Sequence, residues 1–254
     1  WEEYRIPGAL LVPIRNALDE LLSLEAIFPE KTAEGRDKDF LTNGEKVGAF
    51  FAFGELTGAE TALLCEGWAT GASLHECTGL PVVVAFDAGN LKPVAAVLRS
   101  HHASLGLVVC GDNDRKTEGN PGATKAAEAA AAGRGVVCLP EFSDDEPGSD
   151  WNDVHLVRGV EAVREAVLAA VPQAAAAAHA GAESESVAPG AGDEQAPAAA
   201  GSGAEGGSLA RFKMDAAGLW VTLTDRSGNP MRPRFVVEPF KVLSMVRDHN
   251  GLGW

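Results

Sequence analysis

The sequence predicts an α/β fold in which a four-stranded parallel sheet is flanked by helices. Between about residues 59 and 171, short apolar runs alternate with alanine-rich segments, which is the rhythm of right-handed strand–helix–strand units. Two of the apolar runs end in acidic residues, at Glu66 and at Asp112. Short apolar runs bounded by turn formers are typical of buried parallel strands.

The elements of this region are expected in regular alternation. Apolar runs predict strands over residues 61–65, 81–86, 105–110 and 135–139. The alanine-rich segments predict helices over residues 69–78, 91–100, 122–132 and 160–170. Together they make residues 59–171 the predicted catalytic domain.

The regions on either side have a different texture. Residues 1–58 hold short apolar pieces separated by turn formers, which predicts a small β-rich amino-terminal unit. Residues 172–208 consist mainly of Ala, Gly, Ser, Pro and Glu and contain no Lys or Arg, so we expect a disordered linker. Residues 209–254 return to β-type patterning and are interpreted as the start of another, β-containing domain. The absence of an initial Met leads us to expect a piece of a longer polypeptide.

Composition limits the classes of partner. The chain has 36 acidic and 21 basic residues, for a formal net charge of -15, which argues against broad electrostatic binding of a nucleic-acid backbone. Nucleic-acid contacts must therefore be local. The four cysteines show no CxxC spacing and are expected to be buried, reduced thiols. With no apolar run of membrane-spanning length and no leader pattern, we expect no membrane partner and a cytoplasmic location.

Three carboxylates are expected to meet at the carboxyl ends of the strands. Glu66 follows the first strand, and Asp112 and Asp114 follow the third, at the edge where open α/β sheets bind ligands. Like charges held together repel, and a hard divalent cation with oxygen ligands relieves that repulsion. The sequence therefore predicts a Mg²⁺ site, although solvated carboxylates or an Asx-turn would explain these positions as well.

Further polar residues lie near these strand ends. Asp150 and Asp153 could supply more oxygen ligands or an outer hydrogen-bonding shell, or they could cap a helix. Gly67 after Glu66 would let the chain turn and bring backbone N–H groups near a phosphate. Gly89 and Asn90 could cap a helix or present hydrogen-bond donors to a ligand. Four basic residues could contact phosphates or could be solvated surface, namely Lys38, Lys46, Arg115 and Lys116.

Residues 60–165 resemble the Toprim domain of phage and plasmid primases. The resemblance depends on Glu-Gly at 66–67, the segment at 84–91, Asp-Asn-Asp at 112–114 and Asp-Trp-Asn-Asp at 150–153. Residues 8–53 are more weakly similar to the segment that precedes this domain in such proteins. Residues 209–254 are similar to the start of the accessory domain that leads into a helicase in primase-helicase polyproteins.

The resemblance implies a nucleotidyltransferase that makes RNA primers on single-stranded DNA from ribonucleotides, during phage or plasmid replication, with a helicase domain in the same polypeptide. Glu66 would serve as general acid/base or metal ligand, and Asp112 and Asp114 would hold Mg²⁺ or Mn²⁺. Asp150 and Asp153 would lie near the second metal or the nucleotide, and Asn152 would bind nucleotide or DNA. The zinc module of many primases is missing, because the four cysteines cannot form it.

Other functions remain open from the residues alone. A Toprim nuclease would use the same metals to activate water instead of a ribose hydroxyl. A topoisomerase needs a tyrosine nucleophile, and the chain has only Tyr4. A phosphatase with an Asp-x-Asp nucleophile usually carries that pair after its first strand, where this chain has Glu66. A non-catalytic nucleic-acid-binding or assembly module would have to tolerate unneutralised carboxylates.

Overall fold

In a computed structural model of the protein, the described residues are 8–41, 44–185, 211–215, 218–222, 234–237, 246–248 and 251–253. The chain divides into two compact units, which we describe separately. The α/β unit comprises Arg15–Glu20 and Lys46–Val187, and the β unit comprises Trp1–Ile14, Leu21–Glu45 and Ala188–Trp254.

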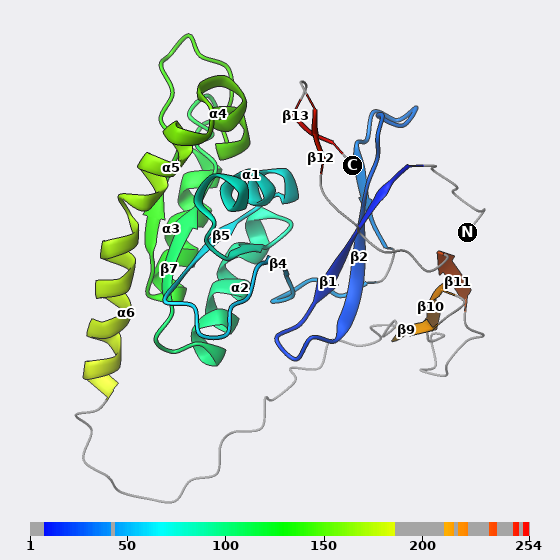
Figure 1. The fold of residues 1–254 in the computed structure, drawn as a ribbon, viewed down its shortest axis with the longest axis horizontal. Coiled ribbons are helices and arrows are strands. Elements are labelled where there is room, and N and C mark those ends of the chain that lie inside the picture. The colour runs from blue at the N-terminus through cyan, green and yellow to red at the C-terminus, as the bar shows by residue number, and fades with distance from the viewer. Residues whose placement is uncertain are drawn as a thin grey trace, which may run out of the picture. The chain divides into compact units, whose positions relative to one another are not determined.

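The α/β unit is built on one mostly parallel sheet (Figure 1). Its strand order is β4-β6-β5-β7-β8, and neighbours among the last four run parallel. The strands are β4 (Phe51–Phe53), β5 (Thr61–Cys65), β6 (Val82–Val84), β7 (Gly106–Cys110) and β8 (Val136–Cys138). The four predicted parallel strands are confirmed.

A fifth strand was not expected in this sheet. β4 pairs antiparallel with β6, Phe51 opposite Val84 and Phe53 opposite Val82. Its residues fall in the segment that we assigned to the amino-terminal unit. The α/β unit accordingly includes Arg15–Glu20 and the chain from Lys46 onward, instead of starting near residue 59. The short run of apolar residues gave no sign of which sheet it would join, because strand pairing is set by contacts distant in sequence.

Helices cover both faces of this sheet. α2 and α3 pack against each other and against the face that carries Leu64, Val83 and Val109. α1, α4 and α5 pack together near the opposite face, because a Cβ added at Gly71 of α1 would lie 2.6 Å from Val84 Cγ2. The helices are α1 (Trp68–Thr78), α2 (Ala88–His101), α3 (Pro121–Gly133), α4 (Trp151–Arg158), α5 (Val160–Leu168) and α6 (Val171–Glu185).

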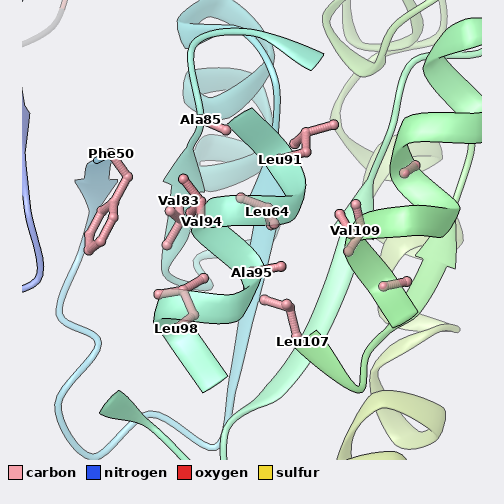
Figure 2. Packing of buried hydrophobic residues seen from close by; sticks show 13 residues of the cluster. Phe50, Leu64, Val83, Ala85, Leu91, Val94, Ala95, Leu98, Leu107 and Val109 are labelled. Atoms are coloured by element: carbon pink, nitrogen blue, oxygen red, sulfur yellow. The ribbon is translucent and has the colours of Figure 1, made fainter. Parts of the chain in front are cut away.

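The main hydrophobic core lies between the sheet and α2. Figure 2 shows Leu64, Val83 and Val109 of the strands turned toward Leu91 and the other apolar residues of α2. These side chains are almost completely buried, as expected for strands covered on both faces. The packing fixes the strands relative to one another and so fixes the loops at their carboxyl ends.

Helix α6 corrects the linker prediction. Its residues Val171–Glu185 include the first part of the segment expected to be disordered. Alanine is the strongest helix former, and Ala174 and Ala178 are buried where α6 packs on β7. The composition gave no sign of this helix, because a segment without large apolar side chains looks unable to pack. Small alanine side chains nevertheless allow a close contact between helix and strand, such as the one at Gly106. Residues 186–208 of the predicted linker lie outside the described part.

The β unit contains the small sheet expected near the amino terminus. β1 (Leu10–Arg15), β2 (Leu21–Ile27) and β3 (Lys38–Phe40) follow one another in the order β1-β2-β3. The described strands of residues 209–254 form antiparallel pairs, as the β-type patterning predicts. They are β9 (Arg211–Asp215), β10 (Gly218–Thr222), β11 (Arg234–Val237), β12 (Val246–Asp248) and β13 (Gly251–Gly253).

Within the described residues, no helix combines the length and apolar character that a membrane crossing requires. The cysteines at positions 65, 77, 110 and 138 are all free thiols. Three of them are buried and Cys138 is partly exposed, which agrees with the expected reduced thiols.

Candidate active site

Acidic residues follow the carboxyl ends of two adjacent parallel strands. Glu66 comes directly after β5, and Asp112 comes two residues after the end of β7. Leu64 of β5 is in register with Val109 of β7, so the two strands end at the same edge of the sheet. This carboxyl edge is where open α/β sheets bind ligands.

Asp150 and Asp153 form a capping box at the start of α4. Asp150 Oδ1 accepts a hydrogen bond from the Asp153 backbone N–H at 2.8 Å. Asp153 Oδ2 accepts from the backbone N–H groups of Ser149 at 2.8 Å and Asp150 at 3.4 Å. The side chain of Thr70 in α1 also hydrogen-bonds to Asp150. The helix-cap alternative is thus observed, and the hydrogen bond from Thr70 ties the starts of α1 and α4 together.

The Asp112–Asp114 segment is fixed from two sides. Asp114 Oδ2 accepts from the backbone N–H of Gly122 at 2.9 Å, in the first turn of α3. Asn113 Nδ2 donates to Pro140 O at 2.8 Å, and the Asn113 backbone N–H donates to Ser149 O at 2.7 Å. The segment therefore connects the start of α3 to the loop that precedes Asp150.

Gly122 is essential to this arrangement. A Cβ at this position would lie 2.5 Å from the backbone oxygen of Asp112 and 2.9 Å from Asp114 Oδ2. Both distances are shorter than real side-chain contacts, and one of the atoms belongs to the backbone. Only glycine lets the first turn of α3 approach the acidic segment this closely.

The electrostatics single out Asp112. Burial raises its pKa to about 7, with further contributions from the carboxylates of Glu66, Asp150, Asp114 and Asp153. Its Oδ1 is buried and has no hydrogen-bond partner among the described residues.

Two neighbours of Asp112, Asp150 and Cys65, also have raised pKa values. Burial also raises the pKa of Asp150. The pKa of the Cys65 thiol is raised by burial and by the charges of Asp112, Asp150 and Glu66. The structure thus brings the predicted acids together around one buried carboxylate.

These acids make a suitable donor set for a hard cation. They present oxygen ligands alone, and the unpartnered Asp112 Oδ1 is a buried acceptor that a cation would satisfy. In the described part of the chain, however, no three acidic, histidine or cysteine side chains converge closely enough to hold one ion together. Side-chain rotation would be needed to bring three of them onto one ion.

Near α2, several predicted ligand-binding residues have structural partners. Lys46 Nζ lies 2.8 Å from Asp87 Oδ2, and Asp87 caps α2 at the Asn90 N–H. Asn90 is buried, and its amide donates to Ala49 O and Ala85 O. These bonds account for both of its amide hydrogens. Gly89 lies in the first turn of the same helix.

Two basic residues predicted to touch phosphates also have protein partners. In the β unit, Lys38 Nζ is 3.5 Å from Glu25 Oε1. Arg115 donates to the backbone oxygens of Gly148, Ser143 and Glu146 and so holds the loop at residues 140–149.

Two more predicted ligand contacts lie close to the acids. Lys116, next to Arg115, is exposed. Gly67 is the N-cap of α1, its φ is −97°, and there is room for a Cβ at this position. The turn therefore does not require glycine, contrary to our expectation. Its backbone remains available to approach a ligand, and for all these positions ligand binding stays a prediction.

Asn152 is hydrogen-bonded to a buried Ser73–His155 pair that sequence reasoning missed. Ser73 Oγ donates to Asn152 Oδ1 at 2.8 Å, and His155 Nδ1 lies 3.1 Å from Ser73 Oγ. Ser73 and His155 lie far apart in the sequence, and no local motif links them. Thr70 was missed for the same reason.

Known proteins are similar to the segment that carries these residues. Residues 61–161 match the Toprim domain. Over 120 residues, 44% of this chain, the sequence is 39% identical to a DNA primase TraC of Escherichia coli, and 37% identical to a second DNA primase TraC of that organism. These matches cover 11% and 8% of the two relatives, so the similarity concerns about a tenth of their length.

Two solved structures are similar at lower sequence identity. One contains the zinc-binding and RNA polymerase domains of the Aquifex aeolicus primase, with a TM-score of 0.46 and 18% identity, over 66% of this chain and 42% of that chain. The other is the DnaG primase catalytic domain bound to ssDNA, with a TM-score of 0.45 and 17% identity, over 65% of this chain and 52% of that chain. By its sequence match and its α/β architecture, the segment at residues 61–161 is a Toprim domain.

Proposed function

We propose that this chain contains the catalytic core of a DNA primase, which makes RNA primers on a single-stranded DNA template by nucleotidyl transfer. The Toprim domain and the sequence identity to TraC primases support this assignment. A helicase domain in the same polypeptide and a plasmid or phage replication system are further parts of the proposal, derived from the sequence resemblance.

The observation that carries the proposal is the state of Asp112. A buried carboxylate with four acidic neighbours and an unpartnered oxygen weakens a fold that does not neutralise it. Such a feature is expected at a catalytic or binding site. We therefore assign it to cation-dependent chemistry rather than to the scaffold.

Glu66, Asp112 and Asp114 are the residues that would hold Mg²⁺ or Mn²⁺, with Asp150 beside them. When bound, the metal would stabilise charge on the reacting phosphate and promote attack by a 3′-hydroxyl. Asp153 has a different part, since its Oδ2 already accepts two backbone N–H groups. Its role is to hold Asp150 in place.

The rest of the site positions these acids. The Asn113 and Gly122 contacts fix the Asp112–Asp114 segment, and the Thr70 contact fixes Asp150. Glu66, at the end of β5, would serve either as a metal ligand or as the group that receives the proton of the attacking hydroxyl. Nucleotidyl transfer depends mainly on such positioning and on charge stabilisation.

The test is primer synthesis by the full-length protein that contains this chain. The protein is incubated with single-stranded DNA, labelled ribonucleotides and MgCl₂, and labelled primers are resolved by size. We expect wild-type protein to make primers, and Asp112→Ala and Glu66→Ala to make none. Asp144→Ala, which removes an exposed acid from the nearby loop, serves as the charge-matched control.

Two results would overturn the proposal. Unchanged primer yield from both site variants would show that the carboxylates do not take part. Cleavage of the DNA without incorporation of ribonucleotides would instead identify a metal-dependent nuclease.

A further inference from the structure

A buried serine and histidine lie between α1 and α4, the helices that follow Glu66 and Asp150. Ser73 has no exposed surface and His155 is 5% exposed. Ser73 Oγ is hydrogen-bonded to both Asn152 Oδ1 and His155 Nδ1. None of these three side chains has a part in the chemistry assigned above to the carboxylates.

The hydrogen bonds define a direction. The Ser73 hydroxyl has one hydrogen, which it donates to Asn152 Oδ1. Toward His155, Ser73 Oγ can then only accept, so His155 Nδ1 must carry a hydrogen. The chain of donors runs from His155 through Ser73 to the carbonyl oxygen of Asn152.

This direction determines what Asn152 presents to its surroundings. Its oxygen is engaged by Ser73, and the described residues include no acceptor for its two amide hydrogens. Asn152 is partly exposed, two residues after Asp150 in the first turn of α4. An N–H group is also the favoured group in the negative field of the nearby acids, whereas an oxygen there would be repelled.

We propose that Ser73 and His155 are positioning residues, which orient the amide of Asn152 so that its N–H groups donate to a phosphate of the bound nucleotide. The inference rests on the proposed function for the identity of that ligand. The orientation itself is the one in which Ser73 Oγ donates to Asn152 Oδ1.

A purely structural role explains the group less well. α1 and α4 pack against each other, and α4 already buries the large apolar side chains of Trp151 and Val154. A buried polar pair contributes little net stability over an apolar pair of similar size, because desolvation offsets most of the hydrogen-bond energy. A chain of two hydrogen bonds that ends on a partly exposed amide is instead what pre-organisation of a ligand donor requires.

The first measurement is the tautomer of His155 by ¹⁵N NMR of the full chain. The inference requires a hydrogen on Nδ1. A neutral ring with its hydrogen on Nε2 alone would reverse the chain of donors, present the Asn152 oxygen instead of the amide, and overturn the inference.

The second measurement is the dissociation constant of a ribonucleoside triphosphate, determined by calorimetry in MgCl₂. We expect Ser73→Ala and His155→Leu to weaken binding about tenfold, because a hydrogen bond to a charged group is lost or misdirected. His155→Asn, which can place an amide N–H near the position of Nδ1, should recover most of the affinity. Thr78→Ala is the matched control, because it removes a hydroxyl from the far end of α1 that bonds to Leu74 O.

The outcomes separate this inference from the proposed function. Folded Ser73→Ala with wild-type affinity, equal losses in Ser73→Ala and Thr78→Ala, or a wild-type chain that does not bind the nucleotide would each overturn it. Should Ser73→Ala fail to fold, the comparison of His155→Leu with His155→Asn decides the matter. Nucleotide binding with the expected pattern but without primer synthesis would support the inference and contradict the proposed function.

Discussion

Two acidic side chains in the same α/β unit have opposite electrostatic surroundings. Asp112 lies among four other carboxylates, and its pKa is raised to about 7 by burial and by their charges. Glu146 receives hydrogen bonds from Arg158 and from the Ser143 backbone, and these lower its pKa to about 2. Arg158 Nη2 is 2.6 Å from Glu146 Oε2.

The difference separates scaffold from site. Glu146 has an opposite charge beside it in Arg158, and the guanidinium groups of Arg115 and Arg158 also lie over the Phe142 ring, 4.8 Å and 5.6 Å from its centroid. These contacts hold the loop at residues 140–149 in place. Asp112 Oδ1, in contrast, is buried without a hydrogen-bond partner among the described residues. Ionised Asp112 therefore opposes folding, and a bound cation would offset that cost.

The largest expected effect comes from Asp112→Asn, which removes the central charge of the cluster. Primer synthesis should fall by about 10³-fold or more, because a metal ligand supplies several kcal/mol of transition-state stabilisation. Stability in metal-free buffer should rise on the order of 4 kcal/mol near pH 8. Steady-state primer assays and urea unfolding measure the two effects.

The gain in stability should depend on pH in a defined way. The pKa of Asp112 is about 7 in the folded chain against an ordinary value of 3.8, so the folded state holds a proton that the unfolded state loses. Stability of the wild type therefore falls as pH rises through this window and then levels off. Asp112→Asn should lack this decline, whereas Asp144→Asn should retain it, and identical profiles for all three proteins would contradict the assignment.

A medium effect is expected from Gly122→Ala, which leaves every charge in place. The added methyl would collide with the Asp112 backbone oxygen and with Asp114 Oδ2, so unfolding should cost about 1–3 kcal/mol less. Primer synthesis should fall with it, because the acidic segment is displaced. Ala127→Ser, at an exposed position of the same helix, controls for substitution in α3, and equal behaviour of the two variants would refute the close approach.

The smallest effect on stability is expected from Glu146→Gln, in the loop where the acid is paired with an arginine. Its partner Arg158 is partly exposed, and exposed ion pairs contribute little. Wild-type stability from this pair is present above the ordinary pKa of 4.5 and is lost as pH falls toward about 2. Urea unfolding should show a small loss near neutral pH that disappears in acid, and a loss as large as that of Gly122→Ala would reverse our division into scaffold and site.

The sequence was informative where a signal is local. The apolar runs before Glu66 and Asp112 predicted the central strands and the edge at which the acids gather, because a buried parallel strand is a continuous apolar run. It was uninformative where partners are distant. Nothing local indicated that β4 would join this sheet, that Ser73 would meet His155, or that Arg115 would hold the loop at residues 140–149.

Composition misled at one place for a related reason. The alanine-rich segment after residue 171 has the content of a linker, yet α6 is stabilised by close packing of Ala174 against the sheet near Gly106. That contact depends on a glycine far away in the sequence. The helix propensity of alanine favours a helix here, whereas the absence of large apolar side chains favours a disordered linker. The tertiary contact with the sheet stabilises the helix.

The most direct test of the central claim is the thermal stability of wild type and Asp112→Asn at about pH 8, with and without MgCl₂. If the carboxylates form a cation site, MgCl₂ will raise the Tm of the wild type substantially, since a ligand of the folded state stabilises it. Asp112→Asn will start at a higher Tm and gain little from the metal. Equal shifts in both proteins, or no shift in either, would contradict the account.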